Sequence, residues 1–291
     1  MPHAAPPDTS AHAGAPASDD ALAREQALEA WLRVHAPVLV GYSGGVDSAY
    51  LAAVAVSALG ADRVLAVTGR SASYPEEQWR AARDHARAVA LPVEELDTRE
   101  LDDPRYAANP TDRCYWCKAE LWARLAPIAR ARGMSLLDGT NADDLHDHRP
   151  GARAAAEHGV HSPLALLGFS KADIRALSAR RGLLTAERPS APCLASRLPY
   201  GTPVTRERLA QVEAAEAALR RLGVVGALRV RHHGPLARVE LAPEALAHWL
   251  APERATLLRD AVLAAGYARA AVDLRGFRSG SLNVLSGVRA A

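Results

Sequence analysis

Three cysteines are spaced in a way that suits metal binding or sulfur chemistry. Cys114 and Cys117 form a C-x-x-C pair, and Cys193 follows in a distant segment, APCLASR. Two thiolates at the closer spacing can share one metal, and a third from far along the chain leaves one coordination position open. Three cysteines are too few, and too odd in number, for a disulfide scaffold, so metal ligands, redox groups and a nucleophile are the functional interpretations.

Plainer interpretations of the cysteines stay open. They could be buried structural residues, a redox disulfide, or a zinc site completed by one of the 11 histidines. Arg113 lies beside Cys114 and Arg197 lies near Cys193, and a cationic neighbour favours the thiolate. These arginines could equally be surface charges.

The hexapeptide SGGVDS predicts a phosphate-binding loop. It contains Ser43, Gly44, Gly45, Asp47 and Ser48, and it follows the apolar run PVLVG. Small residues let the backbone wrap an anion, while the start of the next helix points amide hydrogens and a positive dipole at it. The Walker spacing is missing, and no lysine lies near in the sequence. The alternative is an ordinary glycine turn with a capping Asp or Ser.

A second polar loop, LDGTNADD, follows another apolar run. Its carboxylates Asp143 and Asp144, with Asn141 and Gly139 beside them, are expected at the carboxyl end of a strand. Carboxylates there can hold Mg²⁺ that bridges phosphate oxygens. The choice between the two aspartates stays open, and so does a purely structural role as helix caps.

The elements around these loops alternate between strands and helices. We expect helices over 49–59, 76–90, 118–132 and 171–181, a helical pattern from Ala21, and strands over 37–41, 63–68, 93–96 and 135–138. This order predicts an α/β fold, a doubly wound parallel sheet whose ligand lies at the carboxyl ends of its strands.

The rhythm changes after a Pro-rich segment, 189–203. Helices over 206–222 and 243–265 and strands over 227–231, 237–241 and 271–274 predict a smaller α+β domain. The expected organisation is a disordered tail (1–20), a nucleotide-binding domain (21–190), a connector carrying Cys193 (191–204), and a domain for substrate binding and oligomerisation (205–291).

Composition excludes several classes. The chain has 49% hydrophobic residues, which suffices for a core, and neither a long apolar run nor a signal-like start. We therefore expect a soluble, cytoplasmic protein without a membrane partner. Its 35 basic residues are balanced by 33 acidic ones, so a nucleic-acid face is not indicated.

These motifs together resemble a known family. SGGVDS after VLVGY resembles the PP-loop of N-type ATP pyrophosphatases, which adenylate a carbonyl or carboxyl oxygen. RCYWCK, GTNADD, PCLASRLPYG and DLRGFRSGSLN resemble the LarE family of ATP-dependent sulfur insertases over residues 22–285. The resemblance implies ATP and Mg²⁺ as cofactors, pyridinium-3,5-biscarboxylic acid mononucleotide as substrate, and a role in nickel-pincer nucleotide biosynthesis for lactate racemase.

The resemblance also implies roles for the cysteines. Cys193 matches the sulfur-bearing residue, which some members sacrifice to dehydroalanine. Members with all three cysteines hold a [4Fe–4S] cluster that passes on an extra sulfide. With Cys114 and Cys117 present, the chain resembles that second type, ligated by Cys114, Cys117 and Cys193.

A mononucleotide substrate implies a second phosphate site. Arg229, Arg231 and Arg275 are the candidates, because a guanidinium suits a phosphate dianion, and Glu240 on the next strand could orient one of them. His232 and His233 are expected at the surface. A homo-oligomer is expected, and the rival functions are a tRNA thiolase, an amide-forming synthetase and a non-catalytic adenylate or Fe–S module.

Overall fold

A four-stranded parallel sheet forms the first part of the molecule. The computed structural model describes residues 17–146, 150–189 and 191–278. The strand order is β3-β2-β1-β4, which confirms the α/β class. The strands are β1 (Val38–Gly41), β2 (Val64–Arg70), β3 (Val93–Asp97) and β4 (Ser135–Leu137). The helices before the connector are α1 (Asp19–His35), α2 (Val46–Leu59), α3 (Glu76–Ala88), α4 (Pro104–Ala107), α5 (Arg113–Ala131), α6 (Pro150–Glu157), α7 (Pro163–Leu166) and α8 (Lys171–Arg180).

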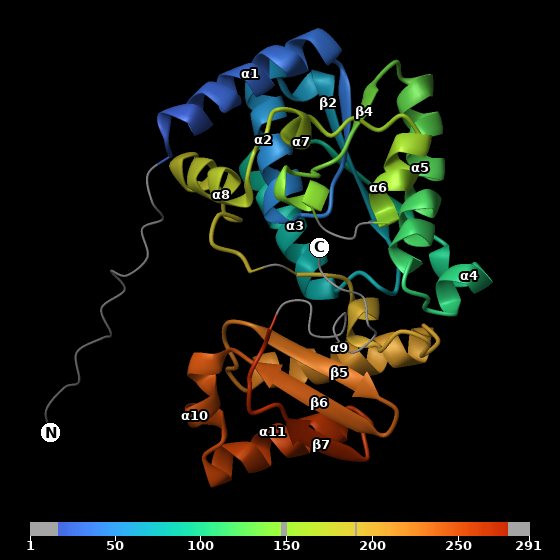
Figure 1. Cartoon of the computed structure of the whole chain (residues 1–291), viewed down its shortest axis with the longest axis vertical. Coiled ribbons are helices and arrows are strands. Elements are labelled where there is room, and N and C mark those ends of the chain that lie inside the picture. The colour runs from blue at the N-terminus through green and yellow to red at the C-terminus, as the bar shows by residue number, and fades with distance from the viewer. Residues whose placement is uncertain (1–16, 147–149, 190, 279–291) are drawn as a thin grey trace, which may run out of the picture.

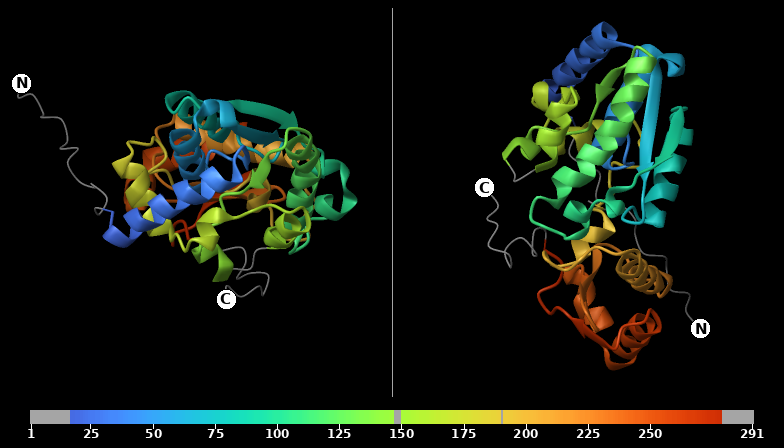
Figure 2. Two further views of the ribbon diagram at one scale, coloured as in Figure 1. Left: turned by 90° about the horizontal axis from the view of Figure 1, so that it is seen from above. Right: turned by 90° about the vertical axis from the view of Figure 1, so that its right-hand side faces the viewer.

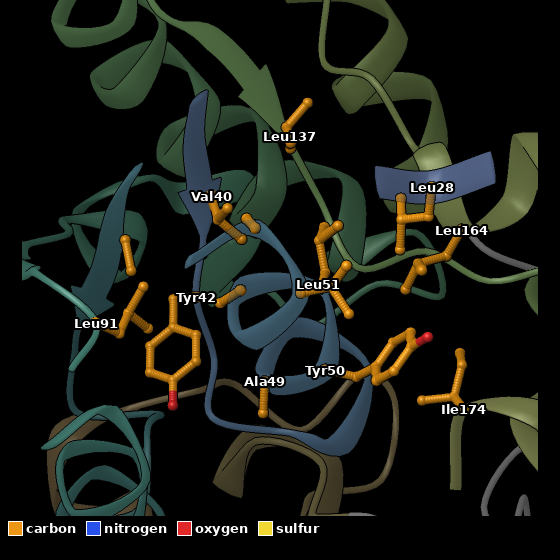
Figure 3. Packing of buried hydrophobic residues seen from close by; sticks show 14 of the residues in the cluster. Leu28, Val40, Tyr42, Ala49, Tyr50, Leu51, Leu91, Leu137, Leu164 and Ile174 are labelled. Carbon is orange, nitrogen blue, oxygen red and sulfur yellow. The ribbon is translucent and has the colours of Figure 1, made fainter. Parts of the chain in front are cut away.

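Helices cover both faces of this sheet, as a doubly wound fold requires (Figure 1). Val38 and Val40 of β1 pack on the side of α1, α2, α3, α7 and α8, as Figure 3 shows for Val40 among its neighbours. Leu39, between them, packs on the opposite side against α5 and α6. Side chains alternate between the two faces along a strand, and helices cover both faces of this sheet. Every position of the run is therefore buried, which explains why the run is apolar throughout.

Two helices begin earlier than the sequence pattern predicts, and both shifts matter for function. α2 begins at Val46 rather than residue 49, so Asp47 and Ser48 lie in its first turn. α5 begins at Arg113 rather than residue 118, so the C-x-x-C pair lies inside the helix and not before it. Burial of the Arg113 side chain among neighbouring segments favours this early start. α6 and α7 were not predicted.

A second, three-stranded sheet follows the connector. β5 (Leu228–His233) pairs antiparallel with β6 (Leu236–Leu241), which pairs parallel with β7 (Arg269–Val272). α9 (Arg206–Arg221) and α11 (Pro252–Ala264) pack against it, and α10 (Leu246–Trp249) is short. The prediction of one long helix over 243–265 was wrong. Pro252 disfavours helical backbone at Ala251, and this residue separates α10 from α11.

The second sheet lies at the end of the parallel sheet where the strands' carboxyl ends meet (Figure 2). The two parts touch directly, because the Glu76 backbone N–H at the start of α3 donates to Glu213 Oε1 of α9 at 2.7 Å. α3 has no capping side chain of its own, since Pro75 precedes it. The predicted tail lies outside the described residues up to residue 16, and α1 begins at Asp19.

No helix among the described residues is long and apolar enough to cross a membrane.

Candidate functional site

The predicted phosphate loop joins β1 to α2. Gly44 has a φ of +65°, a left-handed conformation that suits glycine, and Gly45 is the residue before the first helical position. The Ser43 and Ser48 hydroxyl oxygens lie 3.2 Å apart across the loop. The first amides of α2, from Val46 to Ser48, have no acceptor inside the helix and are available to an anion.

Glycine is required here by close packing. A Cβ on Gly44 would lie 2.3 Å from the Cβ of Ala82 in α3, and a Cβ on Gly139 would lie 2.8 Å from the Ser48 backbone nitrogen. The polar loop after β4 therefore approaches the start of α2 directly. This contact brings the two predicted motifs, SGGVDS and LDGTNADD, into one site.

Lys171 also reaches this site, which the sequence pattern did not suggest. Its Nζ forms an ion pair with Asp47 Oδ2 at 2.5 Å, and Asn141 Nδ2 donates to Asp47 Oδ1 at 3.2 Å. The nearest signal in the sequence is that Lys171 is one of only two lysines in an arginine-rich chain. Lys171 therefore places a flexible ammonium beside the loop. The sequence did not suggest this, because no lysine is near the loop along the chain.

The two candidate Mg²⁺ ligands are already engaged with backbone groups. Asp143 Oδ2 accepts the Lys171 N–H at 2.8 Å, and Asp144 Oδ2 accepts the Asn141 N–H at 3.1 Å. These bonds match the capping role that the sequence left open. Carboxylate oxygens remain the ligand type that Mg²⁺ prefers, so a magnesium role for either residue stays a prediction.

The three cysteines come from two places in the fold. Cys114 and Cys117 lie in the first turns of α5, and Cys193 immediately precedes the short 3₁₀ helix Leu194–Arg197. Cys114 is exposed, whereas Cys117 and Cys193 are half-buried and pack against one small apolar cluster. The Leu194 N–H donates to Ser73 O at 2.8 Å, which ties Cys193 to the turn after β2 and so to the carboxyl edge of the sheet.

Arg113 and Asn109 hold the connector against this edge. Arg113 Nη1 donates to Asn109 Oδ1 at 2.6 Å and to Ala195 O at 3.0 Å, and the Asn109 amide donates to Pro199 O and Thr202 O at 2.8 Å each. Arg113 is only 5% exposed. It is therefore a structural cation beside the cysteines and not a surface charge.

Arg197 holds the other side of the connector. It forms a bidentate pair with Glu216 of α9 at 2.9 Å, and its Nη1 donates to Pro192 O and Cys193 O at 2.5 and 3.0 Å. Its side chain is 3% exposed. The backbone at Cys193 is thus fixed by a buried arginine that also reaches the second domain.

The electrostatics of the Cys117 thiol differ from the expected ones. Burial and then the charge of Glu100 raise the pKa of Cys117, so the expectation that neighbouring arginines favour the thiolate is wrong for this residue. Cys193 and Cys114 add to that rise. Burial opposes the charged form of Arg113, but Cys193, Cys114, Tyr106 and Tyr200 together outweigh it and the pKa of Arg113 is raised. The thiols and Arg113 therefore interact.

The three thiols do not form a ready metal site. Within residues 17–146, 150–189 and 191–278, no three or more His, Cys, Asp or Glu side chains lie in an arrangement that could hold a metal ion. The donor chemistry of three thiolates suits an iron–sulfur cluster, so a cluster held by these cysteines stays a prediction.

The candidate arginines of the second domain divide into two kinds. Arg229 and Arg231 are buried on β5, and Arg231 pairs with Glu240 of β6 at 2.8 Å and donates to Ser196 O at 3.0 Å. Burial, together with nearby Arg197 and Arg231, lowers the pKa of Arg229 to about 10. Arg275 is exposed and pairs with Asp273 of its own turn at 3.2 Å, so it does not join this buried group.

The surface prediction for His232 was wrong. His232 is 4% exposed, and its Nδ1 lies 3.1 Å from the Tyr267 hydroxyl oxygen. His233 is half-buried. Both faces of β5 are covered, one by the apolar core of the second sheet and the other by the connector. The alternation of polar residues along β5 therefore does not indicate a face exposed to solvent.

Known proteins resemble the chain over most of its length. A family model described as NAD synthase matches residues 30–133. An uncharacterized protein of Synechocystis is 43% identical over 246 residues, 84% of this chain and 91% of that protein. An uncharacterized protein of Methanocaldococcus jannaschii is 30% identical over 205 residues, 70% of this chain and 77% of that protein.

A named relative comes from Lactiplantibacillus plantarum. The pyridinium-3,5-bisthiocarboxylic acid mononucleotide synthase of that organism is 35% identical over 251 residues, covering 84% of this chain and 88% of that protein. The match extends through both domains, and the nucleotide domain has the PP-loop architecture. The chain therefore belongs to the LarE family of pyridinium-3,5-bisthiocarboxylic acid mononucleotide synthases.

Proposed function

We propose that this chain is an ATP-dependent sulfurtransferase acting on pyridinium-3,5-biscarboxylic acid mononucleotide. The observation that carries the proposal is the attachment of the Cys193 segment to the same sheet edge as the phosphate loop, through the Leu194 to Ser73 hydrogen bond. Activation of a carboxylate and delivery of sulfur need these two centres near each other.

The first proposed step is adenylation of the substrate. A carboxylate oxygen attacks the α-phosphorus of ATP, an O–P bond forms, and pyrophosphate leaves to give an acyl-adenylate. The amides of Gly44 to Ser48 and the Lys171 ammonium would face the phosphates and stabilise the developing charge. Mg²⁺, held by Asp143 or Asp144, would neutralise phosphate charge when bound.

The second proposed step transfers sulfur. The Cys193 thiolate attacks the acyl carbon, AMP leaves, and a thioester forms. Cleavage of the Cβ–Sγ bond of Cys193, with loss of its α-proton, then gives the thiocarboxylate and leaves dehydroalanine. Arg197 holds the Cys193 carbonyl throughout, so the backbone keeps its place while the side chain reacts.

An iron–sulfur cluster is the other sulfur source, and the presence of all three cysteines favours it over the sacrificial route. Cys114, Cys117 and Cys193 would be its ligands, and a bound cluster would supply a labile sulfide in place of the cysteine sulfur. The packing of Cys117 and Cys193 against one apolar cluster supports this ligand set. The buried Arg229 and Arg231, with the more exposed Arg275, are proposed for the substrate phosphate.

The test combines four measurements on anaerobically purified protein. We expect pyrophosphate release from ATP that depends on the dicarboxylate mononucleotide, and thiocarboxylate product by mass spectrometry. Iron and sulfide analysis identifies a cluster, whereas loss of one H₂S from Cys193 after turnover identifies the sacrificial route.

A matched variant separates the two steps. Cys193→Ser should keep substrate-dependent pyrophosphate release and lose thiocarboxylate formation, because only the sulfur atom is removed. Pyrophosphate release that ignores the mononucleotide, or retention of tRNA on a filter at physiological salt, would contradict the proposed substrate.

A further inference from the structure

The turn between β2 and α3 touches both reacting centres. Tyr74 Oη donates to Ser43 O in the phosphate loop at 2.9 Å. Its neighbour Ser73 accepts the Leu194 N–H through its backbone oxygen at 2.8 Å, next to Cys193. Two adjacent residues therefore connect the nucleotide loop to the sulfur-bearing segment.

The hydrogen bond from Tyr74 controls an amide that faces the phosphates. Ser43 O and the Gly44 N–H belong to one planar trans peptide, so they point in opposite directions. Gln78 Nε2 donates to the same oxygen at 3.1 Å. Gly44 can adopt left-handed and other backbone conformations, so these two side chains, and not the local backbone, fix the direction of its N–H.

The other end of the turn is held firmly. Ser73 is 3% exposed, and its Oγ donates to Glu100 Oε1 at 3.0 Å and lies 2.8 Å from Ser71 Oγ. At the start of α3, the Glu76 N–H is bonded to Glu213 of the second domain. The turn that carries Tyr74 is therefore anchored on both sides, at Glu100 and at α9, and is not a loose loop.

We propose that Tyr74 is a positioning residue that couples phosphate binding in the loop to the placement of Cys193. A bound triphosphate orients the Gly44 N–H, which moves the Ser43 oxygen and, through Tyr74, the turn that holds Leu194. Cys193 would then reach its reactive position only when nucleotide is present. The inference rests on the proposed roles of the loop and of Cys193, and its warrant is a continuous path of two hydrogen bonds, from Tyr74 to Ser43 and from Leu194 to Ser73, joined by the backbone between neighbouring residues.

The test measures the reactivity of one thiol. The rate of Cys193 alkylation by iodoacetamide is followed by mass spectrometry of its peptide, with and without Mg²⁺ and α,β-methylene-ATP. In the wild-type protein we expect the analogue to change this rate by about five-fold or more, a typical size for coupling between two sites. In Tyr74→Phe we expect less than about a two-fold change while calorimetry still shows analogue binding.

The matched control is Tyr115→Phe. It removes a hydroxyl of the same kind, which donates to Glu157 at 2.8 Å and does not touch the loop. It should respond as the wild type does. Gln78→Ala, which removes the second donor to Ser43 O, should reduce the response in part and provides a further test if Tyr74→Phe does not fold.

The affinity for the analogue gives a second readout. Alkylation of Cys193 should change this affinity in the wild type and leave it unchanged in Tyr74→Phe; the size of the change need not equal the change in alkylation rate, because reciprocity holds for binding free energies and not for rates. A full wild-type response in Tyr74→Phe, as simple shielding by nucleotide would give, overturns the coupling. Failure of the analogue to bind the wild type instead contradicts the proposed nucleotide site, and the coupling with it.

Discussion

The phosphate loop and the cysteine region are held in place in opposite ways. The loop is six consecutive residues whose shape depends on missing side chains: Gly44 leaves room for Ala82, and Gly139 of the second polar loop leaves room for the Ser48 backbone. The cysteine region combines α5 with a distant connector, and it depends on buried side chains, chiefly Arg113 and Arg197, that bond to backbone oxygens. The loop should therefore fail when atoms are added, and the cysteine region when atoms are removed.

Adding one methyl group to the loop should give the largest effect. Gly44→Ala places a Cβ within 2.3 Å of Ala82 and keeps a positive φ, so we expect a loss of about 3 kcal/mol in unfolding free energy. Nucleotide binding should fall below detection by calorimetry. The control Gly133→Ala has a similar φ of +60° but no atom within 4 Å, and should cost about 1 kcal/mol. Equal losses in the two variants would remove the steric argument.

Removing a buried cation should be nearly as costly. Arg197→Gln leaves Glu216 without its bidentate partner, and we expect unfolding in urea to show a loss of about 3 kcal/mol. The double variant with Glu216→Gln should recover part of this loss because the unpaired charge is gone. Arg275→Gln, in an exposed pair with Asp273, should leave the midpoint unchanged. A similar loss there would contradict the distinction between the two arginines.

A smaller effect concerns thiol reactivity. Burial and Glu100 raise the pKa of Cys117, so its thiol should react with iodoacetamide more slowly than that of exposed Cys114 near pH 8.5, the ordinary thiol pKa. Glu100→Gln removes the negative charge, lowers the pKa and should increase the Cys117 rate several-fold. Peptide mass spectrometry measures both rates. An unchanged rate would show that Glu100 does not act on this thiol.

The smallest effect is a pH dependence in the second domain. Burial, then Arg208, lowers the pKa of His232 below the unfolded value of 6.5, so the unfolded chain binds the proton more readily. Stability is therefore complete above that value and declines as pH falls below it. His232→Gln should lose less thermal stability between about pH 7.5 and 5.5 than the wild type does. If thermal stability fell equally with pH in both proteins, the pH dependence would come from other groups, such as buried His85.

Local sequence predicts the loop better than it predicts the cysteine region. SGGVDS and its flanking strand and helix are contiguous, so the sequence pattern was enough to place the loop between β1 and α2 and to predict the α/β class. Lys171 reaches Asp47 only because crossovers bring α8 beside α2. Likewise, the burial of Arg113, Arg197 and His232 depends on how the connector docks between the domains, which no local pattern contains.

Element boundaries failed for related reasons. α5 begins early because Arg113 is held by Asn109 and Ala195, a contact between distant segments. Short helices such as α7, four residues long, give too little periodicity to detect. Pro252 is a local signal for a helix break at Ala251. The prediction of one helix over 243–265 followed the apolar pattern of the region instead of this signal.

The bond between the Glu76 amide and Glu213 has a consequence for how the molecule is partitioned. α9 supplies the N-terminal cap of α3, so this helix, which packs against Gly44, is capped only when both halves of the chain are present. An excised N-terminal fragment would fray at that helix end and lose order next to the loop. The boundary that the sequence suggests near residue 205 separates the region of the parallel sheet from the region of the three-stranded sheet. Cooperative folding should nevertheless extend across this boundary.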